Sequence, residues 1–179
     1  MPPAPPPLLR PATPEDAPAI VTIYNDAVAT TTASFDTEPR SVEEQARRVG
    51  THDARHPFLV ADDGGEVVGW AYLTAWSDRK GYARTAESSV YIRADRRGRG
   101  IGRQLLAELL RSARAAGLHT VLARISGGNP ASVRLHVALG FVPVGTMHEV
   151  GHKFGRWIDV GLYQWMAETP GRVPPVTAG

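Results

Sequence analysis

The chain has 179 residues, enough for one domain with a substantial core, and 42% of them are hydrophobic while 21% are charged. Its formal net charge of +2 argues against bulk nucleic-acid binding, and no apolar run approaches the roughly 18 residues that a membrane span requires. The sequence has no cysteine, which excludes disulfides, thiolate metal ligands and a covalent acyl-cysteine intermediate.

The two ends differ in composition from the rest of the chain. Residues 1–7 include five prolines, and residues 169–179 are rich in Pro, Gly and small side chains, so both are predicted to be flexible tails. The first residues contain no basic and apolar segments of a secretory signal, which makes the cytoplasm the expected compartment. Residues 8–168 are expected to form a single domain.

The first half of this domain predicts two helices followed by a hairpin. A short strand over 8–12 precedes a helix over 14–29, which Thr13 would cap and Pro14 would begin. Ser41 and Glu44 form a capping box for a second helix over 42–50, and Phe35 lies in the loop between the two helices. Strands over 58–61 and 66–75 flank a turn rich in Asp and Gly, which indicates an antiparallel hairpin.

The second half alternates strands and helices. Apolar residues at helical spacing and Gly117 predict a helix over 103–116, and Gly140 would close a second helix over 129–139. Strands are predicted over four segments, at 86–93, 119–125, 141–147 and 157–166.

A run of arginines and glycines separates the strand at 86–93 from the following helix. Glycine lacks the Cβ that would keep a ligand off the backbone, and N–H groups at a helix N-terminus attract anions. The residues concerned are Arg97, Gly98, Arg99, Gly100, Ile101, Gly102 and Arg103. A mononucleotide P-loop is excluded because Arg103 and Gln104 replace its Lys-Ser or Lys-Thr pair, and the glycine spacing does not fit a dinucleotide fingerprint.

The pattern Arg97-x-x-Gly100-x-Gly102 after a strand resembles the acetyl-CoA loop of the GNAT N-acetyltransferases. In that family the loop amides hold the pyrophosphate of the coenzyme. The order of predicted elements is similar to the GNAT arrangement as well. The resemblance implies the acyl-CoA N-acyltransferase fold, an α/β fold whose mixed, mostly antiparallel twisted sheet carries helices on both faces.

Five separated segments resemble the phosphinothricin N-acetyltransferases within this superfamily. They are Tyr24-Asn25-Asp26-Ala27-Val28, Phe35-x-Thr37-Glu38-Pro39, Thr85-Ala86-Glu87-Ser88-Ser89-Val90-Tyr91, Ser132 to Phe141, and Gly151 to Gly161. The stretch 153–157 is also similar to methionine sulfoximine acetyltransferases. The resemblance implies that Glu87 is the general base, and the residue types alone favour it because a substrate ammonium must lose a proton before it attacks a thioester.

The resemblance implies further site residues. His136 is expected to face the coenzyme as a secondary catalytic group, although it is equally a helix histidine with a purely structural partner. Amides around Val90, Tyr91 and Ile92 would bind the thioester carbonyl if the strand bulges there, and the pantetheine arm would contact Asn129, itself a helix cap, and Ser132. The substrate-binding residues are expected to be Phe35, Arg79, Tyr82 and Val160.

Two departures from the family pattern affect these expectations. Ser77 stands where the phosphinothricin enzymes have a Lys, so preference among substrates stays open. Phe141 occupies the place of a Tyr that many GNAT enzymes use to protonate the thiolate, which leaves Tyr91 and Tyr82 as candidates and the acid unassigned.

The expected function is acetyl-CoA-dependent acetylation of the α-amine of a small amino-acid analogue, by direct transfer in a ternary complex. Acetylation of another amine, such as a polyamine or a protein N-terminus, is an alternative, and a non-enzymatic nucleic-acid module is a further one. The six histidines show no metal-ligand spacing, so no metal is expected. The resemblance also implies a homodimer, and neither nucleic acid nor a membrane is expected as a partner.

Overall fold

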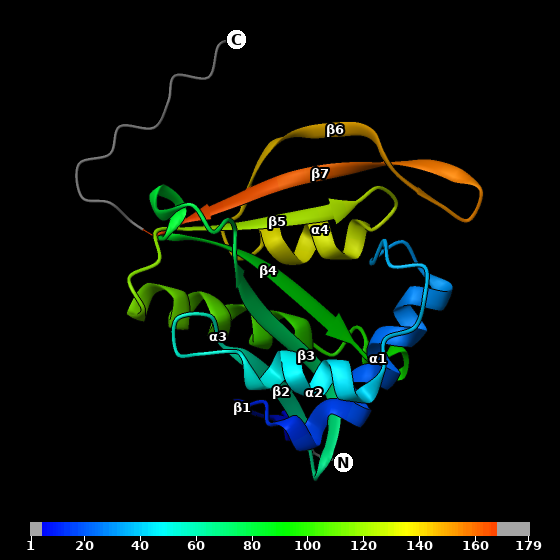
Figure 1. Cartoon of the computed structure of the whole chain (residues 1–179), viewed down its shortest axis with the longest axis vertical. Helices are drawn as coiled ribbons and strands as arrows, with labels where there is room; N and C mark the ends of the chain where they lie inside the picture. Colours follow the sequence, from blue (N-terminus) through cyan, green and yellow to red (C-terminus); the bar gives the residue numbers. More distant parts are fainter. Residues whose placement is uncertain (1–4, 168–179) are drawn as a thin grey trace.

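The computed structural model describes residues 5–167 and contains one seven-stranded sheet, with strand order β1-β2-β3-β4-β5-β7-β6 (Figure 1). Neighbouring strands run antiparallel except β4 and β5, which are parallel. The strands are β1 (Leu8–Pro11), β2 (Phe58–Asp63), β3 (Glu66–Ala75), β4 (Thr85–Ile92), β5 (Thr120–Ser126), β6 (Val142–Lys153) and β7 (Arg156–Met166). The predicted mixed, mostly antiparallel sheet is confirmed.

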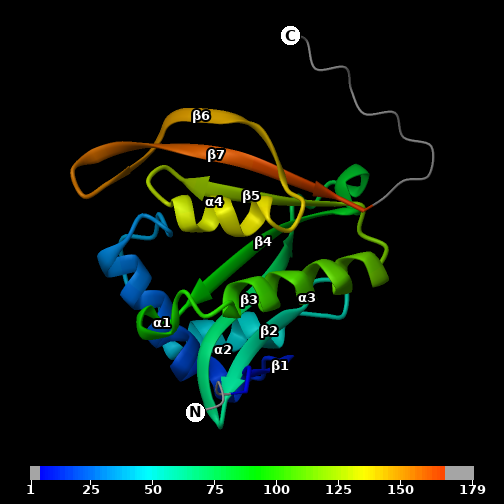
Figure 2. The ribbon, with the colours of Figure 1, turned by 180° about the vertical axis from the view of Figure 1, so that it is seen from behind.

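Helices cover both faces of the sheet, as predicted. They are α1 (Ala17–Thr30), α2 (Val42–Gly50), α3 (Ile101–Ala115) and α4 (Pro130–Val137), with short 3₁₀ turns at Pro14–Asp16, Lys80–Tyr82 and Ala94–Arg96. Side chains alternate between the faces of β2, so Phe58 and Val60 pack with α1 and α2 while Leu59 and Ala61 pack with α3. Figure 2 shows α3 and α4 on the same side of the sheet.

The α3 helix begins earlier than its sequence predicts. It starts at Ile101 instead of Arg103, because Gly100 takes the left-handed conformation (φ 79°) and serves as its N-cap. Two leucines from each of two successive helical turns then pack into the core between α3 and the sheet. Gly102 therefore lies in the first turn of the helix and not in the preceding loop.

Most other boundaries agree with the prediction within two residues, and two elements differ in a more informative way. The helix predicted over 14–29 begins with a 3₁₀ turn, in which Thr13 and Asp16 form a capping box, and becomes α-helical at Ala17. The strand predicted over 141–147 instead runs from Val142 to Lys153, with a bulge between Met147 and Gly151. Within that bulge Glu149 has a φ of 50°, and its amide donates to the Asp159 carboxylate (2.8 Å).

The predicted tails fall largely on residues 1–4 and 168–179, which lie outside the described residues. Within residues 5–167, none of the helices combines the length and apolar character needed to cross a membrane.

Candidate active site

The parallel pairing of β4 with β5 covers only three residues on each strand. Thr85, Ala86 and Glu87 pair with Thr120, Val121 and Leu122, and the strands then separate. Beyond Glu87, β4 stays paired with β3 as far as Ile92, while β5 stays paired with β7 as far as Ser126. The two strands can be followed diverging in Figure 1. Two strand edges therefore face each other without the hydrogen bonds that would join them.

A cavity of about 620 Å³ lies at this divergence. Its walls come from the loop after α1, from β4, β5 and α4, and from the β6–β7 hairpin. The lining residues used below are Phe35, Glu87, Val90, Arg124, His136 and Val160. A volume of this size is typical of a small-molecule site.

The free edge of β4 presents backbone N–H groups to the cavity. The amide of Arg93 donates to Val68 on β3 (3.0 Å), whereas the carbonyl of Arg84 accepts from His119 beside β5 (2.9 Å). Because successive backbone groups of a strand point to opposite sides, the N–H groups of Val90 and Ile92 face β5 and the amide of Tyr91 faces β3. The register with β3 is unbroken, so these amides are exposed by the divergence of the strands and not by a bulge in β4.

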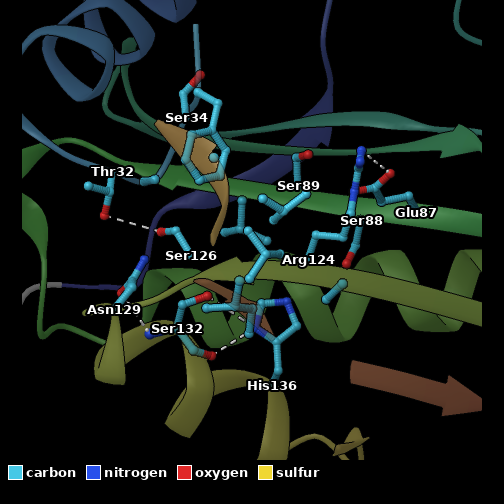
Figure 3. Close-up of a pocket in the computed structure, with 18 of the residues that line it drawn as sticks. Thr32, Ser34, Glu87, Ser88, Ser89, Arg124, Ser126, Asn129, Ser132 and His136 are labelled. Carbon is cyan, nitrogen blue, oxygen red and sulfur yellow. Dashed lines mark hydrogen bonds and ion pairs between the residues drawn. The ribbon is translucent and has the colours of Figure 1, made fainter. Parts of the chain in front are cut away.

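Glu87 lies at the last residue pair before the strands separate, and its carboxylate is held by Arg124 of β5. The two groups form a bidentate pair, with Nε to Oε1 at 2.6 Å and Nη2 to Oε2 at 2.8 Å (Figure 3). The Glu87 side chain is 16% exposed and the Arg124 side chain 53%. The hydrogen bond to Glu87 raises the pKa of the Arg124 guanidinium, so Arg124 carries a permanent charge at the cavity wall.

His136 of α4 lies below this pair in Figure 3, on another wall of the cavity. Its Nδ1 is 2.8 Å from the carbonyl oxygen of Ser132, which can only accept, so Nδ1 carries a proton. Burial lowers the pKa of His136, which keeps the ring neutral and leaves Nε2 as an acceptor. Asn129 caps the same helix, accepting from the Ser132 amide (3.1 Å).

At the loop before α3 and the first turn of that helix, two of four arginines are bound to other groups of the fold, and the first backbone amides have no helical partner. Gly98 and Gly100 both have positive φ angles (76° and 79°), and the first amides of α3 have no partner within the helix. Arg96 is bound to Asp63 (2.6 Å) and Arg97 donates to the Ile92 carbonyl (3.2 Å). Arg99 and Arg103 make no ion pair with any residue in the described part of the chain. The arrangement suits a polyanion.

The loop at 32–36 contributes another wall of the cavity, and three of the contacts that hold it come from β4, β5 and β6. Ser126 of β5 donates to the Thr32 hydroxyl (3.3 Å), the Tyr91 hydroxyl donates to the Ala33 carbonyl (3.1 Å), and the buried Lys153 donates to the Ser34 carbonyl (2.7 Å). These contacts place the Phe35 ring against Gly151 of β6, where both line the cavity. Val160, buried on β7, lines it as well.

Two of the expected substrate residues do not line this cavity. Arg79 and Tyr82 lie at the 3₁₀ turn before β4, and both are exposed, Tyr82 by 46%. In contrast, several lining residues were not singled out from the sequence, and Arg124 is the most consequential of them. The signal in the sequence is a lone charged side chain within the otherwise uncharged strand 120–126. No group of three or more His, Asp or Glu residues within 5–167 is arranged to hold a metal.

Comparison with known proteins settles the family. The acetyltransferase (GNAT) domain matches residues 9–162. The chain belongs to the GNAT acetyltransferase family. It is therefore an acetyltransferase, as its sequence predicts.

Curated relatives and a solved structure cover most of the chain. An L-methionine sulfoximine/L-methionine sulfone acetyltransferase of Pseudomonas paraeruginosa is 47% identical over 161 residues, which cover 87% of this chain and 92% of that protein. A phosphinothricin N-acetyltransferase of Streptomyces viridochromogenes is 40% identical over 168 residues, covering 94% and 92%. A phosphinothricin acetyltransferase from Sinorhizobium meliloti, solved in complex with acetyl-CoA, superposes with a TM-score of 0.86 at 36% identity, covering 95% and 97%. The predicted resemblance to both enzyme groups is confirmed.

Proposed function

We propose that the protein transfers the acetyl group of acetyl-CoA to the α-amine of a small amino-acid analogue of the methionine sulfoximine, methionine sulfone or phosphinothricin type. The observation that carries the proposal is the position of Glu87, at the point where β4 leaves β5 and within the wall of the cavity between them. Two relatives named for such compounds are 47% and 40% identical to this chain. A cavity of about 620 Å³ has the size of a small-molecule site, which favours a small substrate over a protein N-terminus.

Glu87 supplies the base that this reaction needs. The amine enters as an ammonium ion, and the Glu87 carboxylate takes a proton from it, directly or through a water. The neutral nitrogen then attacks the thioester carbonyl carbon, so that an N–C bond forms and the C–S bond breaks. The N–H groups of Val90 and Ile92, which face the divergence, are placed to donate to the carbonyl oxygen as negative charge develops on it. The released thiolate takes up a proton, and the products are the N-acetylated compound and free coenzyme A.

The loop from Arg97 to Arg103 is the proposed holder of the coenzyme's diphosphate. Its free amides at the start of α3 and the unpaired guanidinium groups of Arg99 and Arg103 provide the donors. We assign Asn129 and Ser132, at the start of α4, to the pantetheine arm, and Phe35 and Val160 to the amino-acid side chain. His136, neutral and with a free Nε2, is a secondary group beside them.

Neither tyrosine considered from the sequence is well placed to protonate the coenzyme A thiolate. Tyr91 lines the cavity, but its hydroxyl proton is donated to the Ala33 carbonyl, and burial raises its pKa above the ordinary value. Tyr82 lies outside the cavity lining.

A homodimer in the cytoplasm completes the proposal. β6 is an edge strand and carries exposed apolar side chains. They are Val142 (51% exposed), Val144 (53%) and Val150 (54%). A second copy of the chain would cover them. Light scattering of the purified protein measures the assembly.

Protection of cells against phosphinothricin, relative to cells without the gene, measures whether the activity confers herbicide resistance.

The decisive experiment is an acetylation assay that follows free thiol. The protein is incubated with acetyl-CoA and, separately, methionine sulfone, methionine sulfoximine, phosphinothricin, spermidine and a peptide with a free N-terminus. Turnover of the amino-acid analogues at least tenfold faster than that of spermidine or the peptide supports the proposal. Preference for spermidine or the peptide contradicts the proposed substrate, and no turnover of any amine contradicts the proposed reaction.

A further inference from the structure

Arg124 holds the proposed base in a way that the proposed reaction alone does not explain. Its Nε and Nη2 bind both oxygens of Glu87 (2.6 and 2.8 Å). An arginine bound in this fashion occupies the oxygen atoms that would accept a proton. Glu87 can serve as a base only when another group takes over part of the interaction with Arg124.

An amino acid carries the two charges that would complete such an exchange. Its ammonium and carboxylate groups are attached to the same carbon, so they lie side by side with opposite charge. Glu87 and Arg124 present the complementary pair in direct contact. An ammonium bound to Glu87 therefore brings its own carboxylate within reach of the guanidinium.

The rest of the cavity offers no other permanent cation. Among the described residues that line it, Arg124 is the only Arg or Lys. The histidine on the α4 wall is neutral because burial lowers the pKa of His136. Arg79, which the family resemblance assigns to substrate binding, does not line the cavity.

The guanidinium of Arg124 is also accessible to a ligand. Its side chain is 53% exposed, and its Nη1 makes no hydrogen bond within residues 5–167. The Trp76 ring lies 5.9 Å from the guanidinium carbon, on the side of the loop before β4. Figure 3 shows the side chain rising from β5 toward Glu87. One donor is thus free, and two more become free when the ammonium replaces Arg124 at Glu87.

From this geometry we infer that Arg124 binds the α-carboxylate of the substrate and thereby selects α-amino acids over amines that lack a carboxylate. The inference rests on the proposed function and deepens it. Substrate binding exchanges the internal Arg124–Glu87 pair for two pairs with the zwitterion. The same exchange frees Glu87 from the guanidinium at the moment when it must take a proton.

The test compares one substrate with and without its negative charge. Methionine sulfone and its α-carboxamide have the same side chain and nearly the same size, and kcat/KM is measured for both with the wild type and with Arg124→Gln. Loss of one charged hydrogen-bonding partner is expected to lower kcat/KM for the acid by about 10- to 100-fold. The value for the carboxamide is expected to change far less. The ratio of kcat/KM for the acid to kcat/KM for the amide is then compared between the wild type and each variant. This comparison cancels the difference in intrinsic reactivity between the two amines.

Two further variants make the result specific. Arg124→Lys keeps the charge without the planar fork, and it is expected to retain part of the preference for the acid. Arg79→Gln removes the alternative cation and is expected to leave the ratio unchanged. If thermal unfolding shows that Arg124→Gln does not fold, Arg124→Lys takes its place. Its acid-to-amide ratio of kcat/KM is expected to be lower than that of the wild type.

The outcomes separate this inference from the proposed function. If Arg124→Gln lowers kcat/KM equally for the acid and the amide, Arg124 only holds Glu87 and the inference is overturned. A large fall of the acid-to-amide ratio in Arg79→Gln overturns it as well. A wild type that acetylates no amino-acid analogue rejects the proposed function itself.

Discussion

Glu87 pairs with Leu122 in the last residue pair that joins β4 to β5. One residue further along, the two strands have separated, and the facing edges belong to the wall of a cavity. The carboxylate therefore stands where a ligand lying between the strands would present its reactive end. Because β4 keeps its register with β3 throughout, the position of Glu87 is fixed by the sheet and not by a mobile loop.

Replacement of Glu87 by Gln is expected to remove the base and keep the shape of the site. General-base catalysis contributes about 10²- to 10⁴-fold, so kcat should fall by about 100-fold or more. The dissociation constant of acetyl-CoA, measured by calorimetry, should stay unchanged. Glu108→Gln is the matched control, since Glu108 also pairs with an arginine, Arg111, but on the surface of α3. A Glu87→Gln enzyme that keeps the wild-type rate at neutral pH excludes Glu87 as the base.

Gly100 and Gly117 provide a matched pair for testing the loop before α3. They flank the two ends of this helix, both have positive φ angles (79° and 74°), and a Cβ on either would meet open space. Alanine at each position therefore costs a similar conformational free energy, about 1–2 kcal/mol. Only Gly100→Ala disturbs the amides proposed to hold the diphosphate, so only this variant should bind acetyl-CoA more weakly in calorimetry. Equal weakening by both variants, after comparison of their thermal stability, argues that the loop has no direct role.

Local sequence patterns predict most helices and strands well, because the start and end of a helix or hairpin depend on residues close in the sequence. The hairpin follows from its Asp and Gly turn, and the N-terminus of α4 follows from Asn129 and Pro130. The end of β6 was missed because its last six residues, from His148 to Lys153, contain a bulge that interrupts the alternation of apolar and polar side chains. The start of α3 was placed late because a glycine in a first helical turn reads as part of a loop.

The site was predicted less completely, since it depends on how distant segments pair. Glu87 and Arg124 are separated by 37 positions, and their contact requires the parallel register of β4 with β5. Nothing local in either strand specifies that register. Conversely, Arg79 and Tyr82 were selected by likeness to relatives, and the structure leaves both outside the cavity lining.

Gly151 is expected to control the position of Phe35. A Cβ at Gly151 would overlap the Phe35 ring, whereas a Cβ at Gly145 on the same strand would meet nothing within 4 Å. Gly151→Ala should therefore displace the ring and lower kcat/KM for the amino-acid substrate, with a smaller effect on the KM of acetyl-CoA. Gly145→Ala should leave both values near those of the wild type. If steady-state kinetics of the two variants agree, Phe35 does not contribute to the substrate pocket.

Two histidines should make the folded state less stable as the pH falls below neutrality. Burial lowers the pKa of both His136 and His52 below 6.5, so the unfolded chain binds protons at a pH where the folded chain does not. The free energy of unfolding then rises with pH across the interval below about 6.5, and it decreases on acidification. Above pH 5 the carboxylates with lowered pKa values, such as Asp16 and Asp159, stay ionised in both states and add little.

Urea unfolding at intervals between pH 5 and 7.5 measures this dependence. His136→Gln and His52→Gln should each reduce the slope of the free energy of unfolding against pH, and the double variant should reduce it further. The control is His119→Gln, because His119 is exposed and should leave the slope as it is in the wild type. The comparison uses slopes and not absolute stabilities, so a general loss of stability from replacing a buried ring does not affect it. A wild-type slope preserved in the double variant contradicts the assignment of this pH dependence to His136 and His52.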